Sequence, residues 1–135
     1  MRKVLTVFLA AQFAIAGVAI GTVTEAQEPR RVAAKNGESV ELGPIYWVVN
    51  CRSTMIGLPE IEVLEGPPEV TLSIKEGEIL PRRQGCAAKV PGGTLMLSVK
   101  GVTERTEVKL TFRLKFKTRD GDRQTSHALI VSLFP

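Results

Sequence analysis

The sequence contains few of the residues that enzymes and metal centres commonly use. Histidine occurs once, at His127, cysteine occurs twice, at Cys51 and Cys86, and aromatic residues make up 5% of the 135 residues. One histidine and two cysteines do not provide the three or four ligands of a typical zinc site. The scarcity of aromatic residues also argues against stacking platforms for sugars or for single-stranded nucleic acid.

The arrangement of the polar residues does not favour catalysis either. Ser126 precedes His127, but neighbours on a strand point to opposite faces, so the two cannot act as nucleophile and base. Glu60 and Glu62 share one face of a short strand; paired carboxylates are used by glycosidases, but a solvated acidic face is the simpler interpretation. The soft metal ligands are His127, Met55 and Met96. We therefore predict no catalytic residue, no metal site, no cofactor and no enzymatic activity.

The chain begins with two basic residues, Arg2 and Lys3, followed by a long uncharged segment. Residues 4–20 carry no charged side chain, and Thr24-Glu25-Ala26 follows. Small residues at these spacings suit a signal peptidase, so we predict a signal helix over residues 1–26 that is cleaved after Ala26. Cleavage after Ala19 and an uncleaved membrane anchor are the alternatives. The prediction places the mature chain in the periplasm or outside the cell, with membrane contact only through a retained leader.

The two cysteines lie 35 positions apart. In an oxidising compartment an isolated pair is most simply a disulfide, with free thiols or a metal pair as the alternative. Closing a loop of this length contributes roughly 3–4 kcal/mol in the chain-entropy model. That is a large part of the free energy of unfolding of a small domain.

No segment after residue 26 has a sustained helical period. Short runs alternate apolar and polar residues between glycines and prolines, which is typical of antiparallel β structure. Strands are expected at residues 38–42, 45–49, 61–65, 70–74, 94–102, 108–116 and 123–134.

Three local signals refine this pattern. The continuous apolar run 45–49 favours a central strand, residues 91–93 a turn, and Asp120-Gly121 a tight hairpin turn. We predict a two-sheet sandwich over residues 37–135, after a flexible mature N-terminus over residues 27–36.

The chain resembles one known architecture in two features. Trp47 lies four residues before Cys51, and the last two strands form a long hairpin. In these respects it resembles an immunoglobulin-like sandwich, which implies a single antiparallel β-sandwich of about seven strands. Trp47 precedes both cysteines and their spacing is short, so the predicted disulfide is not the inter-sheet bond of that family. The chain also resembles small exported bacterial proteins of unassigned function, and that likeness implies no activity.

Basic residues concentrate in the second half of the mature chain. Residues 27–80 contain 5 basic and 9 acidic side chains, whereas residues 81–135 contain 11 basic and 4 acidic ones. One face of the strand at 108–116 and its extension forms a basic stripe, which consists of Lys109, Arg113, Lys115 and Lys117. Further cations predicted at the binding surface are Arg82, Arg83, Arg119 and Arg123.

The basic stripe has two interpretations. It is either a solvated outer face whose lysines discourage edge pairing or a surface that binds another protein or an anionic envelope component. Nucleic acid is not an expected partner, because an exported protein is separated from the nucleic acid of the cell.

These observations predict a non-enzymatic binding or interaction module. The first alternative is a small inhibitor of an envelope or secreted hydrolase. Such an inhibitor would insert the loop that carries Arg82 and Arg83, held rigid by Cys86. The second alternative is a metal-binding periplasmic protein that uses His127.

Overall fold

A computed structural model describes residues 29–135, so the predicted signal helix lies outside the described part of the chain. The strands are β2 (Arg30–Lys35), β3 (Ser39–Ile45), β4 (Val48–Val49), β5 (Arg52–Ser53), β6 (Glu60–Glu65), β7 (Val70–Ile79), β8 (Val90–Val99), β9 (Thr106–Thr118) and β10 (Gly121–Phe134), with a 3-10 turn, η3 (Arg82–Gln84). The described residues contain no α-helix, which confirms the all-β prediction. None of their helical turns is long and apolar enough to cross a membrane.

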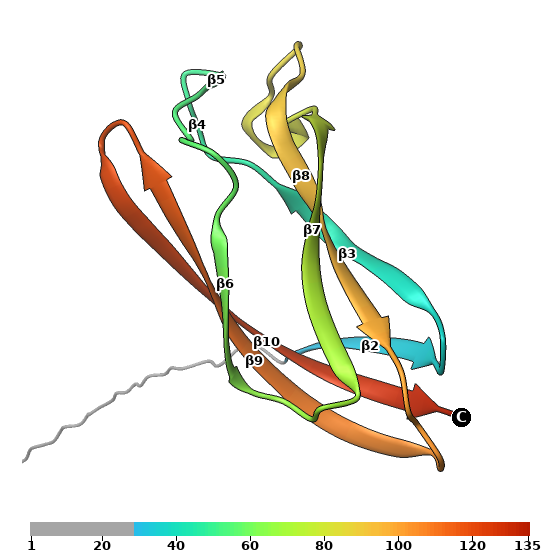
Figure 1. The fold of residues 1–135 in the computed structure, drawn as a ribbon. Coiled ribbons are helices and arrows are strands. Elements are labelled where there is room, and N and C mark those ends of the chain that lie inside the picture. The colour runs from blue at the N-terminus through green and yellow to red at the C-terminus, as the bar shows by residue number, and fades with distance from the viewer. Residues whose placement is uncertain (1–28) are drawn as a thin grey trace, which may run out of the picture.

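Two sheets face each other across the core. One has the strand order β2-β10-β9-β6 and the other β3-β8-β7, while β4 and β5 form a separate small hairpin (Figure 1). Every neighbouring pair is antiparallel except β2, which runs parallel to β10. The sandwich-like arrangement of two mainly antiparallel sheets was predicted and is confirmed.

The hairpin β9–β10 is the longest element and follows directly from the sequence. Leu110, Phe112, Leu114 and Phe116 are buried on one face of β9, and the residues between them lie on the other face. The turn places Gly121 opposite Thr118 and gives Gly121 a φ of 111°. Because glycine adopts positive φ without a steric cost, the predicted tight turn forms here.

The sandwich has two unlike ends. The sheets lie close where β2 and the C-terminus lie, and they diverge toward the β4–β5 hairpin (Figure 1). On the inner face of β10, Leu129, Val131 and Leu133 are at most 5% exposed. Earlier on the same face, Arg123 and His127 are exposed. We call these regions the closed end and the open end.

The prediction of a central strand over residues 45–49 was wrong. β3 ends at Ile45, and β4 contains only Val48 and Val49 before the chain reverses. The apolar residues serve other contacts, because Ile45 enters the core and the Trp47 ring lies 5.0 Å from that of Phe116. A continuous apolar run cannot distinguish these uses from a buried strand.

Two further predictions were wrong. Most of the segment 27–36, predicted to be flexible, is β2, whose residues pair with β10 from Leu129 to Phe134. Residues 91–93, predicted to form a turn, lie inside β8. A Cβ atom on Gly92 would contact the Ile45 carbonyl oxygen of β3, and one on Gly93 would lie 2.8 Å from the Lys75 oxygen of β7. These glycines therefore permit close approach of neighbouring strands.

Candidate functional site: a groove at the open end

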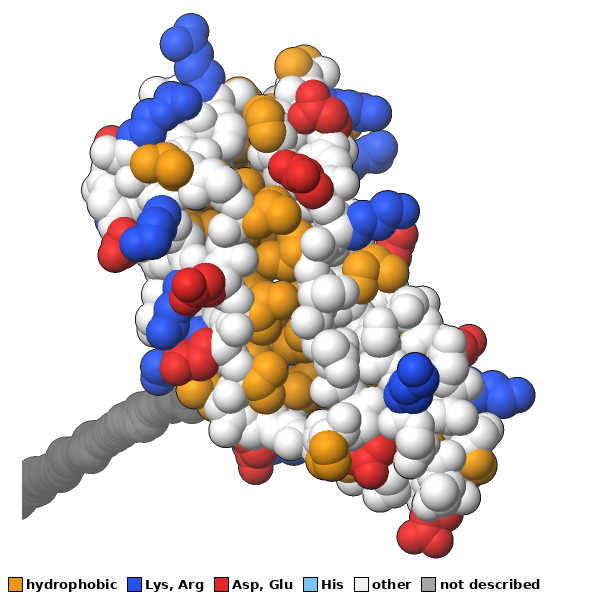
Figure 2. Space-filling view, in the orientation of Figure 1, with side chains coloured by type: hydrophobic (Ala, Val, Ile, Leu, Met, Phe, Trp, Pro, Cys, Tyr) orange, Lys and Arg blue, Asp and Glu red, His pale blue; other side chains and the backbone are white. Residues whose placement is uncertain are grey.

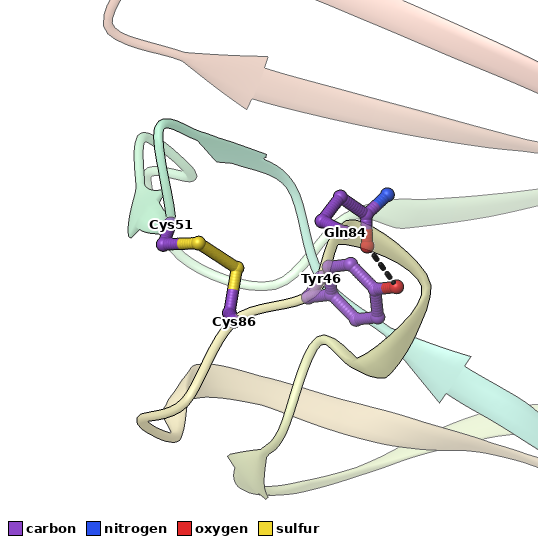
Figure 3. Close-up of a disulfide and its surroundings, with 4 residues drawn as sticks. All are labelled: Tyr46, Cys51, Gln84 and Cys86. Carbon is purple, nitrogen blue, oxygen red and sulfur yellow. Dashed lines mark hydrogen bonds between the residues drawn. A yellow bond between two sulfur atoms is a disulfide. The ribbon is translucent and has the colours of Figure 1, made fainter.

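A disulfide fastens the loops of the open end, as predicted. Cys51 and Cys86 are bonded, with 5.5 Å between their Cα atoms (Figure 3). Cys51 and Asn50 form the tight turn between β4 and β5, with φ values of 63° and 53°. The Tyr46 hydroxyl donates a hydrogen bond to Gln84 Oε1 at 2.7 Å. Two contacts, one covalent, therefore hold the segment after β3 against the loop that contains η3.

The tip of the β9–β10 hairpin is covered on its β9 side only. The Ile56 amide donates to the Lys117 carbonyl at 2.7 Å, and the Arg119 amide donates to the Thr54 carbonyl at 3.0 Å. These contacts continue the sheet beyond the start of β6. They leave β9 with partners along both edges near the tip. Within residues 29–135, β10 has a β-strand partner only along its edge toward β9 over residues 121–127.

A groove of about 830 Å³ lies between the free edges of β3 and β10 at the open end. Leu95, Phe112, Leu114 and Phe116 contribute apolar surface to it. The polar residues that line it are Arg30, Tyr46, Arg83, Gln84, Thr125, Ser126 and His127. No acidic side chain belongs to this lining, which is drawn from residues 29–135. The groove thus combines an apolar surface with cationic and neutral polar groups.

Arg30 and His127 are held in place within the groove. The Arg30 side chain donates from Nη1 to the Leu42 carbonyl, so it connects β2 to the free edge of β3. The His127 ring stacks on Phe112, with 5.1 Å between the ring centroids, and Nε2 lies 2.9 Å from the Thr125 hydroxyl. His127 is exposed as a whole residue, but its ring is partly desolvated where it stacks on Phe112, and this desolvation lowers the pKa of His127 from its ordinary value of 6.5. The ring is therefore mostly neutral at neutral pH, and suits hydrogen bonding and stacking.

The free edge of β10 can be located from the hydrogen bonds at its ends. The Phe134 carbonyl accepts a bond from Asn36, on the β2 side, and the Lys117 carbonyl of β9 faces away from β10. Backbone groups in a strand alternate between its two edges. It follows that the even-numbered residues of β10 face the β2 side. Within residues 29–135, the groups of Asp122, Gln124 and Ser126 have no neighbouring strand, because β2 begins at Arg30, opposite Leu129. In this parallel register the Arg30 amide lies against the Ala128 carbonyl.

The basic stripe lies on the outer face of the four-stranded sheet, away from the groove. Its members alternate with the buried residues of β9. Neighbouring strands place carboxylates among them: Glu62 Oε1 lies 3.5 Å from Arg113 Nη1 and 3.4 Å from Lys115 Nζ. These distances allow electrostatic attraction in a solvent-exposed setting, where an ion pair contributes little. Asp122 also pairs in register with Lys117. Acidic neighbours thus partly offset the charge of the stripe.

The other four predicted cations lie near the open end but not in one cluster. Arg82 and Arg83 belong to η3, and of these Arg83 lines the groove. Arg119 occupies the hairpin tip, and Arg123 donates from its side chain to the Asp122 carbonyl at 3.1 Å. Arg123 lines a smaller cavity of about 550 Å³ beside Lys115, Lys117 and Glu60. The structure therefore brings only Arg83 of the predicted set into the groove.

A second opening lies on the opposite side of the sandwich. Figure 2 shows hydrophobic side chains exposed in a stripe between β6 and β7, the outermost strands of the two sheets on that side. Val63 of β6 is 51% exposed, although it pairs in register with the buried Phe112. On β7, Leu72 and Ile74 are only partly buried. This opening is apolar, whereas the groove beside β10 carries cations and an unpaired backbone.

The sequence contained an unused sign of the groove. The inner-facing residues of β10 change from Arg123, Thr125 and His127 to Leu129, Val131 and Leu133. A polar half and an apolar half on one strand face indicate that only the second half is covered. No comparable sequence pattern indicates that Arg30 and Tyr46 line the groove, because their positions depend on contacts between distant segments.

Neither the comparisons with known proteins nor the side chains of residues 29–135 identify a family or a metal site. Among residues 29–135, no group of three or more His, Cys, Asp or Glu side chains is placed to hold a metal ion. No protein-family model matches the chain, and a search of curated proteins finds no match either.

Proposed function

We propose that this chain is an exported, non-enzymatic binding protein with an immunoglobulin-like sandwich, and that its partner is another protein. The disulfide is compatible with an oxidising compartment, which supports export. Two facing, mainly antiparallel sheets with the strand orders β2-β10-β9-β6 and β3-β8-β7 support the immunoglobulin-like part of the proposal. The periplasm or the cell exterior is the proposed location.

The groove at the open end is the observation that carries the binding function. It offers about 830 Å³ with an apolar surface and convergent polar groups, which is a size and composition typical of ligand sites. Its loops are fastened by the disulfide and by the Tyr46–Gln84 hydrogen bond, so little order has to be gained on binding. The basic stripe remains an alternative binding surface for an acidic protein or another anionic envelope component.

Photo-cross-linking in the cell envelope tests this proposal and compares the two surfaces. One tagged protein carries a photoreactive residue in place of Thr125, on the inner face of β10 and in the groove lining, and another carries it in place of Lys109. We expect a discrete cross-linked protein from position 125 and none, or less, from position 109. The same product from position 109 alone would assign binding to the basic stripe. The absence of any protein cross-link from both positions would contradict a protein-binding function.

The second candidate function is inhibition of an envelope or secreted hydrolase by the loop around η3. It is favoured by the disulfide and the Tyr46–Gln84 contact, which hold this loop with Arg82 and Arg83 exposed. If the loop inhibits a hydrolase, Cys86→Ser should abolish inhibition while a folded fraction stays measurable by near-ultraviolet circular dichroism. Full inhibition by the reduced, folded variant would exclude a role for the fastened loop.

A further inference from the structure

We infer that the groove binds an extended acidic segment of the partner protein, which adds as a strand along the free edge of β10. The inference rests on the proposed protein-binding function and names the chemistry of the partner. A strand added to an open sheet edge gains main-chain hydrogen bonds, and pockets beside the edge select alternate side chains. The open end of this sandwich supplies both parts.

The backbone part is the edge of β10 from Asp122 to Ser126. Within residues 29–135, the amide and carbonyl groups of the even-numbered residues along it face no neighbouring strand, although the Asp122 carbonyl accepts a bond from the Arg123 side chain. Five residues of strand extend about 17 Å at about 3.3 Å per residue. Asp122, Gln124 and Ser126 therefore offer a continuous template for a partner segment of similar length.

The side-chain part is the groove itself. Alternate side chains of an added strand would face the apolar surface formed in part by Leu95 and Leu114. Arg30 and Arg83 line the same groove, no acidic residue does, and neither arginine forms an ion pair within residues 29–135. Charge complementarity therefore selects a segment in which apolar residues alternate with Asp or Glu.

Other occupants fit less well. The predicted cleavage after Ala26 leaves only Gln27, Glu28 and Pro29 ahead of β2. Three residues span about 10 Å, well short of the free edge of about 17 Å, and Pro29 has no amide hydrogen to donate. A second copy paired edge to edge would bring the arginines of both grooves together, which opposes association. A separate acidic segment avoids both difficulties.

Peptide selection provides the first test. Random peptides displayed on phage are selected on the immobilised mature protein, and the most enriched sequence is synthesised with a fluorescent label. We expect enriched peptides that alternate apolar and acidic residues, and we expect a twin with Lys in place of each Asp and Glu to bind at least about tenfold more weakly in anisotropy titrations. Failure to enrich any peptide, or enrichment of sequences without acidic residues, would overturn the inference.

Matched variants then locate the peptide. Ser126→Pro removes an amide hydrogen on the free edge, where proline is tolerated, and Ser126→Ala keeps it. Arg83→Glu reverses a charge in the groove, and Lys109→Glu makes the same change in the basic stripe. We expect a loss of about tenfold or more for Ser126→Pro and Arg83→Glu, and almost none for the two controls. Binding that is lost only with Lys109→Glu would overturn the groove as the site while leaving a protein-binding function intact.

Amide hydrogen exchange completes the test and needs no variant to fold. The amides of Gln124 and Ser126 should exchange quickly in the free mature protein and slowly with the selected peptide bound. If they are already protected in the free protein, the edge is covered by the chain itself or by a second copy, and the inference is wrong. Protection by polyphosphate, used as a simple polyanion, instead of by the peptide would likewise overturn it.

Discussion

The closed and open ends of the sandwich use the same strand, β10, in opposite ways. At the closed end its inner face is apolar, buried and flanked by β9 and β2. At the open end the same face carries Thr125 and His127, and no strand among residues 29–135 pairs with the edge toward β2. One long hairpin can therefore supply the core of a small domain and still extend beyond it as an exposed surface.

The largest expected effect tests whether stability resides in the closed end. Leu133→Ala removes a side chain with no exposed surface and should lower the free energy of unfolding by about 2–5 kcal/mol. Thr125→Ala, on the same face of the same strand, should change it by less than about 0.5 kcal/mol. Urea denaturation followed by Trp47 fluorescence measures both. Equal losses would mean that the open end is packed as tightly as the closed end.

The disulfide should have the next largest effect, although it lies at the open end. Replacing Cys51 and Cys86 with serine frees a loop of 35 residues, which costs roughly 3–4 kcal/mol in the chain-entropy model and often less in practice. Stability falls in this model because the unfolded chain has more conformational entropy without the disulfide. Thermal denaturation of the double variant gives the loss. If it is negligible, the unfolded chain is already restricted near this loop.

Proline scanning of β10 gives a smaller and more local contrast. The backbone amides of Ser132 and Ser126 both point toward the β2 side. Among residues 29–135 only that of Ser132 meets a strand there, where Ser132 is in register with Ala33. Ser132→Pro should remove a ladder hydrogen bond and leave a buried acceptor unpaired, which costs about 1–3 kcal/mol. Ser126→Pro should cost clearly less, because its amide faces no strand. Similar losses in urea midpoint for the two variants would show that the edge of β10 is covered along its whole length.

The smallest expected effect concerns the protonation of His127. Because burial lowers its pKa from 6.5, the unfolded chain binds more protons than the folded chain in the window below that value. The stability associated with this residue is therefore complete above about pH 6.5, falls as the pH decreases, and levels off below the folded-state pKa. His127→Gln should remove that dependence. Melting temperatures of both proteins from pH 7.5 to 4.5 give the comparison, and parallel curves would contradict it.

The sequence was sufficient for the parts of the fold that depend on local pattern. Strict alternation located β9, Asp120-Gly121 located its turn, and an isolated cysteine pair identified the disulfide. Segments 27–36 and 91–93 were assigned wrongly because β2 exists only through its pairing with β10, and glycines 92 and 93 have their role only where β3 and β7 approach β8. The groove was missed for a related reason. It forms because β10 begins eight residues before its pairing with β2, and such an offset between strands depends on contacts between distant segments.

The parallel pairing of β2 with β10 also bears on the order in which the domain assembles. Arg30 lies opposite Leu129, so nearly the whole described chain separates the two partners. If the chain is exported as proposed and crosses the membrane N-terminus first, β3, β7 and β8 are available for pairing before β10 emerges. The four-stranded sheet, and with it the closed end, would then form last. Such pairing across a long loop gives a high contact order and slow folding, so a chain exported in this way would spend its most vulnerable interval with the apolar half of its core exposed to other proteins and proteases.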